Sequence, residues 1–210
     1  MFLEIKGIKK HYGEGESRVE VLNGIDIEVN KGEIVVLLGP SGSGKSTLLN
    51  IIGGIDDADE GFISIDGEKT ADMNEKRLTQ YRRKHLGYVF QMYNLISHLN
   101  VEQNIDVGKY LSKNPLNKEE LLQTLGLKEH RYKRFSELSG GMKRRVALAR
   151  ALSYPGKLII LDEPFTGLDK DTKLNVIDYI LKMRNNRTLL IATHGTDDAD
   201  LLGAKIIKLD

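Results

Sequence analysis

Nine consecutive residues, GPSGSGKST at 39–47, combine glycines, a lysine and hydroxyl groups in the spacing of a phosphate-binding loop. Glycines allow the backbone to wrap a phosphate with its N–H groups, and a helix that begins after the loop adds positive potential. Lys45 is placed to reach the β- and γ-phosphates of a nucleotide, and the Ser46 hydroxyl to ligate Mg²⁺. The alternative is a glycine-rich turn without a ligand, which is disfavoured because the motif matches at every fixed position. The predicted nucleotide-contacting set is Gly39, Pro40, Ser41, Gly42, Ser43, Gly44, Lys45, Ser46 and Thr47.

Two adjacent carboxylates, Asp162 and Glu163, follow the apolar run LIIL at 158–161. Neighbouring side chains on a strand point to opposite faces, so the two acids are not expected to share one role. We assign Asp162 to the Mg²⁺ shell and Glu163 to the attacking water as general base. Acids are also common in surface loops after strands, but the phosphate loop upstream disfavours that alternative. ATP is favoured weakly over GTP, because the nearest match to a guanine-reading motif, at 117–120, follows no apolar run.

A second glycine-rich segment, LSGG at 138–141, stands directly before a stretch of helical composition. Ser139 is suited to cap that helix, and with Gly140 and Gly141 it forms a second helix N-terminus that can receive an anion. Taken alone, these residues are best interpreted as an ordinary N-cap. One nucleotide does not need two such sites from one chain, unless two chains share it.

Hydrophobic patterning predicts the elements that must position these residues. Strands buried on both faces of a parallel sheet are indicated by the continuous apolar runs at 34–38, 158–161 and 189–192. Half-buried strands of a smaller antiparallel sheet are indicated by alternating residues at 3–8, 19–29 and 63–65. Helical spacing recurs at 48–52, 142–152 and 174–181, and a polar, helix-like insertion covers about 94–136. The predicted fold class is α/β, with residues 1–210 in one domain.

Composition limits the classes of protein that this chain can belong to. Its 210 residues are the size of one large α/β domain, and the absence of cysteine excludes disulfides and thiolate metal sites. The net charge of +1 favours, for the basic clusters at 82–85 and 143–145, either solvated faces or arginines that pair locally around the nucleotide, so no nucleic-acid partner is expected. Early charged residues argue against a secretion signal, and no apolar run is long enough to cross a bilayer. These features predict a soluble, cytoplasmic protein.

Together, the motifs resemble those of the ATP-binding cassette (ABC) ATPases, over essentially the whole chain. GPSGSGKST is similar to the family's Walker A motif, LSGG to its signature and LIILDEP to its Walker B motif. Gln91 in YVFQ resembles the Q-loop glutamine, Asp169 at the end of TGLD the D-loop aspartate, and His194 the switch histidine. Tyr12 stands where the family carries an aromatic residue that stacks on adenine.

The resemblance implies a P-loop NTPase core and an ATP-dependent head-to-tail homodimer. ATP and Mg²⁺ would lie between Lys45 of one chain and Ser139, Gly140 and Gly141 of the other. Gln91 would contact Mg²⁺ and the attacking water, and His194 would bond the γ-phosphate. The implied catalytic set is Glu163, His194, Gln91 and Lys45. The implied metal ligands are Ser46, Gln91 and Asp162, and Asp169 and Tyr12 join the nucleotide-contacting set.

Residues 82–105 carry a closer likeness, to the ATPases of macrolide, lipoprotein-release and antimicrobial-peptide systems and to the cell-division ATPase. Such ATPases pair with a four-helix membrane permease that has a large extracytoplasmic domain, which implies a peripheral location on the inner face of the membrane. The permease is expected to dock on the helical insertion, around 91–99. The implied function is ATP-driven export or release of a peptide, lipid-linked or antibiotic-type substrate. The alternative is a mechanotransmitting or sensory ATPase that regulates a membrane partner without transport.

The sequence also departs from the family pattern, for example at Gln103, where the subgroup often has glutamate, and at Ser97, which replaces a frequent proline. The signature continues with MKRR at 142–145 where glutamines are usual, which puts the nearby dimer contacts in question. Gly195 follows the switch histidine where an aspartate is common.

Overall fold

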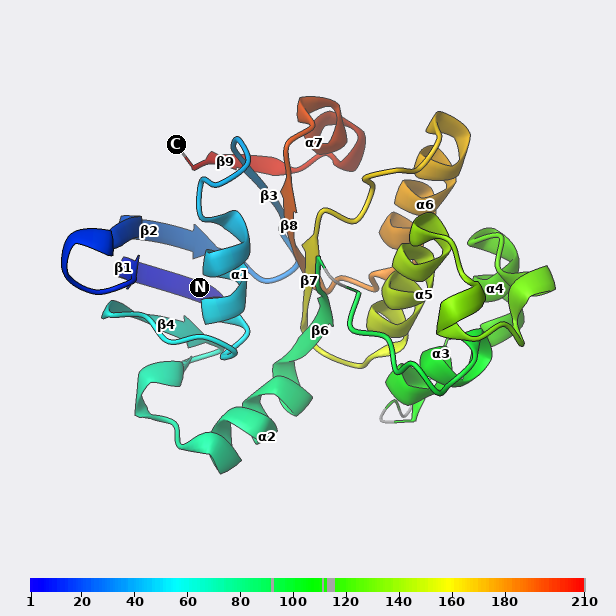
Figure 1. The fold of residues 1–210 in the computed structure, drawn as a ribbon, viewed down its shortest axis with the longest axis horizontal. Helices are drawn as coiled ribbons and strands as arrows, with labels where there is room; N and C mark the ends of the chain where they lie inside the picture. The colour runs from blue at the N-terminus through cyan, green and yellow to red at the C-terminus, as the bar shows by residue number, and fades with distance from the viewer. Residues whose placement is uncertain (92, 111, 113–115, 210) are drawn as a thin grey trace.

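A five-stranded parallel sheet and a four-stranded antiparallel sheet form the framework of the computed structural model, which describes residues 1–91, 93–110, 112 and 116–209 (Figure 1). The parallel sheet has the order β6-β7-β8-β3-β9, with bounds Leu86–Val89, Leu158–Asp162, Thr188–Thr193, Ile34–Leu38 and Lys205–Lys208. The antiparallel sheet has the order β2-β1-β4-β5, with bounds Val19–Val29, Leu3–Tyr12, Glu60–Ile65 and Glu68–Lys69. The predicted α/β fold, with its two kinds of sheet, is confirmed.

Helices cover both faces of the parallel sheet. Helix α1 (Lys45–Ile52) lies between the two sheets, and α5 (Gly140–Ser153) and α6 (Lys170–Met183) cover the opposite face (Figure 1). The other helices are α2 (Glu75–His85), α3 (Val101–Lys109), α4 (Lys118–Thr124) and α7 (Thr196–Leu202). Short 3₁₀ turns are η1 (Gly15–Ser17), η2 (Thr70–Asp72), η3 (Lys128–His130) and η4 (Phe135–Glu137). Within the described ranges, none of the helices combines the length and the apolar character needed to cross a bilayer.

The alternation of side chains along the parallel strands divides the core into two layers. In β3, Val36 packs with α5 and α6, whereas Val35 and Leu37 face α1 and the antiparallel sheet. All five residues of β7 are buried, as the continuous apolar run predicts. Parallel pairing of β3 with β8 and of β8 with β7 keeps the carboxyl ends of the three strands at one edge. This edge is where the sequence places its candidate site residues.

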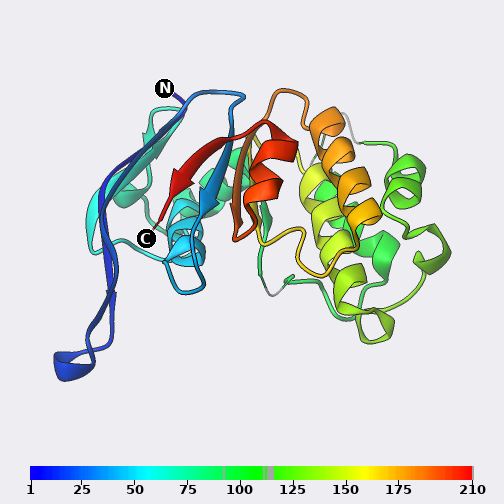
Figure 2. The same cartoon turned by 90° about the horizontal axis from the view of Figure 1, so that it is seen from above.

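The strands β1 and β2 form a long hairpin that extends away from the rest of the molecule and carries η1 at its tip (Figure 2). At the opposite end of the molecule, α3 and α4 belong to the segment predicted as a helical insertion. Asn100 precedes α3 in a capping box, in which its side chain accepts from Gln103 N and the Gln103 side chain accepts from Asn100 N. The Asn117 side chain caps α4 by accepting from the backbone N–H groups of Glu119 and Glu120. Asn117, the first residue of the segment at 117–120 that partly matches a guanine-reading motif, is therefore a helix cap.

Candidate active site

The phosphate loop joins the carboxyl end of β3 to α1 through backbone that only glycine adopts easily. Gly42 and Gly44 have φ angles of 88° and 81°, in the left-handed region. A Cβ atom on Gly44 would lie 2.8 Å from the carbonyl oxygen of Val21, closer than side chains approach. The loop therefore turns tightly, and it presents the N-terminus of α1, with Lys45 as its first residue.

Lys45 is 7% exposed, and its ammonium group is held inside the loop. Its Nζ donates hydrogen bonds to the carbonyl oxygens of Gly39 and Pro40, at 2.7 Å each. The carbonyls place this positive charge where a bound phosphate chain would meet it. Gly39 and Pro40 thus position Lys45 from behind, instead of lining the cavity themselves.

Asp162, the last residue of β7, is 4% exposed, and its Oδ1 has no hydrogen-bond partner among the described residues. Burial raises the pKa of this carboxyl above its ordinary value, and the nearby Ser46 hydroxyl lowers it. A buried carboxylate oxygen without a partner beside a hydroxyl is the hard oxygen pair that Mg²⁺ prefers. No group of three or more His, Cys, Asp or Glu that could hold a metal ion occurs among the described residues. A cation at Asp162 would therefore complete its shell with water and phosphate oxygens.

Glu163 follows Asp162 just after the end of β7, so the alternation of a strand, on which the sequence prediction relied, does not extend to it. Its φ angle of 50° is unusual for a residue with a side chain, and its N–H donates to the Ala192 carbonyl at 2.9 Å. The Glu163 carboxylate contacts two side chains, one from the segment after β8 and one three residues further along its own turn. His194 Nδ1 lies 3.1 Å from Oε1 and 3.0 Å from Oε2, and the Thr166 hydroxyl donates to Oε2 at 2.9 Å. The bent backbone thus aims this acid at the edge of the sheet.

A cavity of about 700 Å³ lies beside these groups at the carboxyl edge of the parallel sheet, although Asp162 itself is not one of its lining residues. Its lining residues are Val21, Ser41, Gly42, Gly44, Lys45, Ser46, Thr47, Gln91, Arg144, Glu163, Thr166 and His194. Gln91 reaches it because β6 pairs with β7 and ends beside it. The structure therefore brings together four predicted catalytic residues that are far apart in sequence.

Three lining residues, Val21, Thr166 and Arg144, were not among the residues predicted from the sequence. Thr166 belongs to the turn after β7, and its hydroxyl donates a hydrogen bond to Glu163. Its position three residues after Glu163 is the only feature of the sequence that could have indicated this contact. Arg144 belongs to the MKRR departure, and its guanidinium lies over the Tyr93 ring at 5.4 Å from the ring centroid. The sequence left open that arginines at 143–145 lie around the nucleotide, but it did not single out Arg144 among the basic residues of α5.

Several predicted nucleotide-contacting residues do not line this cavity. The hydroxyl of Ser139 caps α5 by accepting from Met142 N at 3.3 Å, with Gly140 and Gly141 in the first turn. Asp169 caps α6 by accepting from Thr172 N at 2.9 Å. The Tyr12 hydroxyl donates to Asp56 and lies beside Thr47, at the rim of the phosphate loop. The Ser43 hydroxyl lies behind the loop, 3.4 Å from the Lys45 ammonium.

Comparisons with known proteins agree on one family. A family model described as "ABC transporter" matches residues 22–166. The chain is 39% identical over 213 residues to the putative ABC transporter ATP-binding protein MG065 homolog of Mycoplasma pneumoniae, covering 99% of this chain and 46% of that protein. It is 41% identical over 198 residues to the macrolide export ATP-binding/permease protein MacB of Escherichia coli K12, covering 91% and 31%. The chain thus spans less than half the length of these curated relatives.

Solved structures give the same result over the whole fold. A dimeric post-hydrolysis state of the ATP-binding cassette MJ0796, bound to ADP and Pi, superposes with a TM-score of 0.89 and 33% sequence identity. The match covers 99% of this chain and 94% of that one. A second dimeric MJ0796 structure, described as a bacterial ABC transporter cassette, gives a TM-score of 0.87 and 32% identity.

Proposed function

This chain belongs to the ABC transporter family of ATPases, and from this premise we propose that it is the nucleotide-binding subunit of a membrane transport complex. We further propose that residues 1–210 form one nucleotide-binding domain, with a helical insertion at about 94–136. The observation that carries the proposal is the meeting of Lys45, Asp162 and the Glu163–His194 pair at one edge of the parallel sheet. In parallel α/β sheets, this edge is where ligands bind.

In the proposed reaction, water attacks the γ-phosphate of ATP and the bond to the β-phosphate breaks. The amides of the phosphate loop bind the phosphates, and Lys45 exchanges its bonds to Gly39 and Pro40 for phosphate oxygens. Glu163 takes the proton of the attacking water, and His194 reaches the γ-phosphate from beside it. Mg²⁺, when bound with the nucleotide, neutralises phosphate charge, and Ser46, Asp162 and Gln91 are its proposed ligands.

A second copy of the chain is proposed to complete the site. Ser139, Gly140 and Gly141 start α5 but do not line their own chain's cavity, so the amides of this helix N-terminus are available to an opposing nucleotide. Asp169 is proposed to lie at the same interface, and Tyr12 to contact adenine at the rim of the phosphate loop. The solved MJ0796 structures are dimers, which supports the arrangement.

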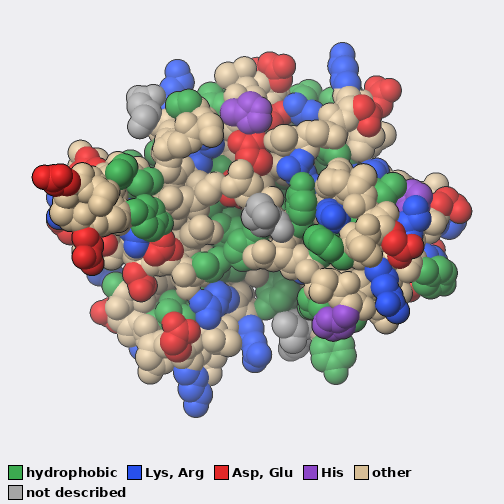
Figure 3. All heavy atoms as spheres, in the orientation of Figure 1, with side chains coloured by type: hydrophobic (Ala, Val, Ile, Leu, Met, Phe, Trp, Pro, Cys, Tyr) green, Lys and Arg blue, Asp and Glu red, His purple; other side chains and the backbone are tan. Residues whose placement is uncertain are grey.

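A membrane permease is the proposed partner, with the chain held peripherally on the inner face of the membrane. MacB, by its name, joins an ATP-binding part and a permease, and this chain matches 31% of it. A groove of about 550 Å³ lies between α2, β6 and α3, lined by apolar residues such as Tyr88, Phe90 and Val107. Figure 3 shows hydrophobic side chains in a hollow below the centre of this face, with Lys and Arg side chains beside it. Such a surface suits an amphipathic helix from the permease.

The groove adjoins the segment predicted for docking. Arg150 lines the groove and donates to the Asn94 and Tyr93 carbonyls at 2.8 and 3.1 Å, so it connects the groove to the 91–99 segment. Residue 92 of that segment lies outside the described residues. We propose export or release of a peptide, lipid-linked or antibiotic-type substrate, as the likeness to a macrolide exporter supports.

The experiment that tests this function is affinity capture of the Glu163→Gln variant from its native membranes in the presence of ATP. Capture of a polytopic membrane protein with a large outer domain supports the proposal, and substrate movement in vesicles containing both proteins then separates transport from regulation. The matched control is the same variant with Ser139→Arg added, which is expected to lose the ATP-dependent part of the capture. Recovery of soluble partners alone would contradict the membrane role.

A further inference from the structure

A charged network behind His194 plays no part in the mechanism described so far. Asp198 lies in the first turn of α7 and is 3% exposed. Its Oδ2 accepts a hydrogen bond from the Thr193 hydroxyl at 2.7 Å, and its Oδ1 is ion-paired with the Lys173 ammonium of α6. Thr193 directly precedes His194, so the buried carboxylate connects α6 to the histidine that contacts Glu163.

Gly195, on the other side of His194, is hydrogen-bonded to both Thr193 and Asp198. Gly195 N donates to the Thr193 hydroxyl at 3.2 Å, and Asp198 N donates to the Gly195 carbonyl at 3.3 Å. A Cβ atom on Gly195 would lie 3.1 Å from Asp198 Oδ2, a contact tighter than side chains normally make. The glycine that departs from the family pattern therefore leaves room for Asp198, and a second carboxylate there would repel it.

The other end of the network lies in the helix that Asp169 caps. Lys173 N donates to the Asp169 carbonyl at 2.9 Å, so Lys173 stands one turn into α6. The Lys173 side chain is 25% exposed and that of Asp198 is 5% exposed. Removing one member of such a buried pair leaves the other charge uncompensated, so the two residues constrain each other's position.

We propose that Asp198 is a positioning residue that holds His194 against Glu163 and ties it to α6 through Lys173. This inference rests on the proposed ATPase function, because His194 acts there beside the γ-phosphate. Any movement of α6, whose cap Asp169 is proposed to face the second chain, passes through Lys173 and Asp198 to the loop that carries His194. Neither Asp198 nor Lys173 lines the cavity, and among the described residues the Glu163 carboxylate is hydrogen-bonded to Thr166 and His194, so the proposed effect of the network runs through the histidine.

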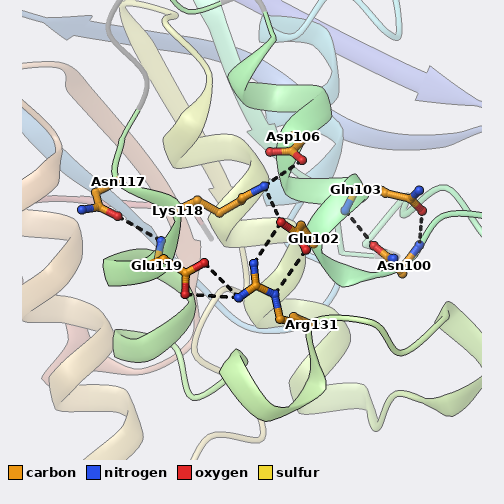
Figure 4. A network of polar contacts seen from close by, with 8 residues as sticks. All are labelled: Asn100, Glu102, Gln103, Asp106, Asn117, Lys118, Glu119 and Arg131. Atoms are coloured by element: carbon orange, nitrogen blue, oxygen red, sulfur yellow. Dashed lines mark hydrogen bonds and ion pairs between the residues drawn. The ribbon is translucent and has the colours of Figure 1, made fainter.

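The test measures steady-state ATP hydrolysis by the full chain with Asp198→Asn and, separately, Lys173→Met. Asparagine keeps an acceptor for the Thr193 hydroxyl but removes the charge. We expect kcat to fall roughly 10- to 100-fold, since small displacements of a catalytic group have effects of that size, while the KM for ATP stays within about twofold. The matched control is Lys118→Met, which breaks partly buried ion pairs with Glu102 and Asp106 (Figure 4). None of these three residues lines the cavity, so this variant should leave kcat unchanged.

The decisive comparison places Asp198→Asn in a His194→Ala background. If Asp198 acts through His194, the added substitution leaves the residual single-turnover rate unchanged, whereas a general structural role lowers it again. The ring signals of His194 in an NMR spectrum give a readout without activity, and they should shift in Asp198→Asn but not in Lys118→Met. An unchanged kcat, an equal loss in both backgrounds or unmoved ring signals would overturn the inference. Failure of the wild-type chain to hydrolyse ATP would instead contradict the proposed function.

Discussion

His194 Nδ1 lies 3.0 Å from Oε2 and 3.1 Å from Oε1 of Glu163, although the two residues follow the ends of different strands, β8 and β7. The imidazole is 66% exposed on its side chain and the carboxylate 16%, so the pair stands at the cavity wall with the acid on the inner side. A carboxylate held by a histidine and by the Thr166 hydroxyl has a fixed orientation before any water arrives. Preorganisation of this kind is what a general base requires.

The first prediction concerns the carboxylate itself. Glu163→Gln keeps the size and the hydrogen-bonding capacity of the side chain but removes its basicity. Because a positioned base contributes about 10²- to 10⁴-fold, we expect phosphate release to slow by at least about 100-fold while ATP still binds. Light scattering should then show a dimer that persists with ATP. Glu129→Gln, at an exposed acid in η3, serves as the control, and wild-type turnover in Glu163→Gln would contradict the assigned base.

The Thr166 hydroxyl gives a second, graded prediction. Thr166→Val keeps the shape of the side chain and removes the donor to Glu163 Oε2. A single hydrogen bond contributes modestly, so we expect kcat to fall about 2- to 10-fold with little change in the KM for ATP. Thr166→Ser, which retains the hydroxyl, should recover most of the rate. Equal rates in the valine and serine variants would show that the hydroxyl does not orient the base.

Sequence alone predicted the parts of this site that depend on local chemistry. The runs at 34–38 and 158–161 predicted buried parallel strands, and the phosphate-loop spacing fixed Lys45 and Ser46 at the end of the first. These predictions succeed because burial on both faces of a strand and a tight glycine turn each depend on a few residues that are adjacent in the sequence. The order of the strands in the sheet could not be predicted in this way, because the packing of segments distant in sequence decides which strands are neighbours.

The contacts that the sequence did not reveal are those made across strands. The bond between Glu163 and His194 follows from the pairing of β7 with β8, which no local pattern specifies. Arg144 lines the cavity because of the way α5 is turned about its axis. The sequence does not distinguish an arginine on that side of the helix from one on a side that faces solvent. Conversely, Ser139 was interpretable from residues alone only as a cap, and a cap is what it forms within one chain.

The third prediction tests the sharing of the site between two chains. Ser139→Arg places a long cationic side chain at the N-terminus of α5, outside the cavity of its own chain. We expect the monomer to bind ATP with an affinity within about threefold of wild type, which is less than about 1 kcal/mol, because its phosphate loop is untouched. Dimer formation by the Glu163→Gln chain with ATP should be lost when Ser139→Arg is added.

The control for steric bulk is Thr79→Arg, which adds the same side chain at an exposed position on α2. This variant should dimerise as well as its parent in light-scattering measurements. A dimer fraction that Ser139→Arg leaves unchanged would show that α5 does not face the opposing nucleotide.

The last prediction concerns stability and pH at the network between α3, α4 and η3 (Figure 4). Glu102 accepts hydrogen bonds from Arg131 Nη2 and Nε at 3.0 and 3.2 Å, and Lys118 is ion-paired with the same carboxylate. The Arg131 hydrogen bonds, followed by those of Lys118, lower the pKa of Glu102 from 4.5 to about 2. Stability from a carboxylate with a lowered folded-state pKa is fully present above its unfolded pKa and is lost as the pH falls through the folded value.

We therefore expect Glu102→Gln to lower the melting temperature at pH 7 by roughly 2–6 °C, since it removes charge-assisted hydrogen bonds that bind α3 to the turn at 128–131. The difference between the two chains should shrink as the pH is lowered from 4.5 towards 2, because protonation then removes the same charge from the wild-type side chain. Differential scanning calorimetry across this range measures both effects, with Glu129→Gln as an exposed control. A difference in melting temperature that is constant with pH would show that the Glu102 carboxylate does not act through its charge.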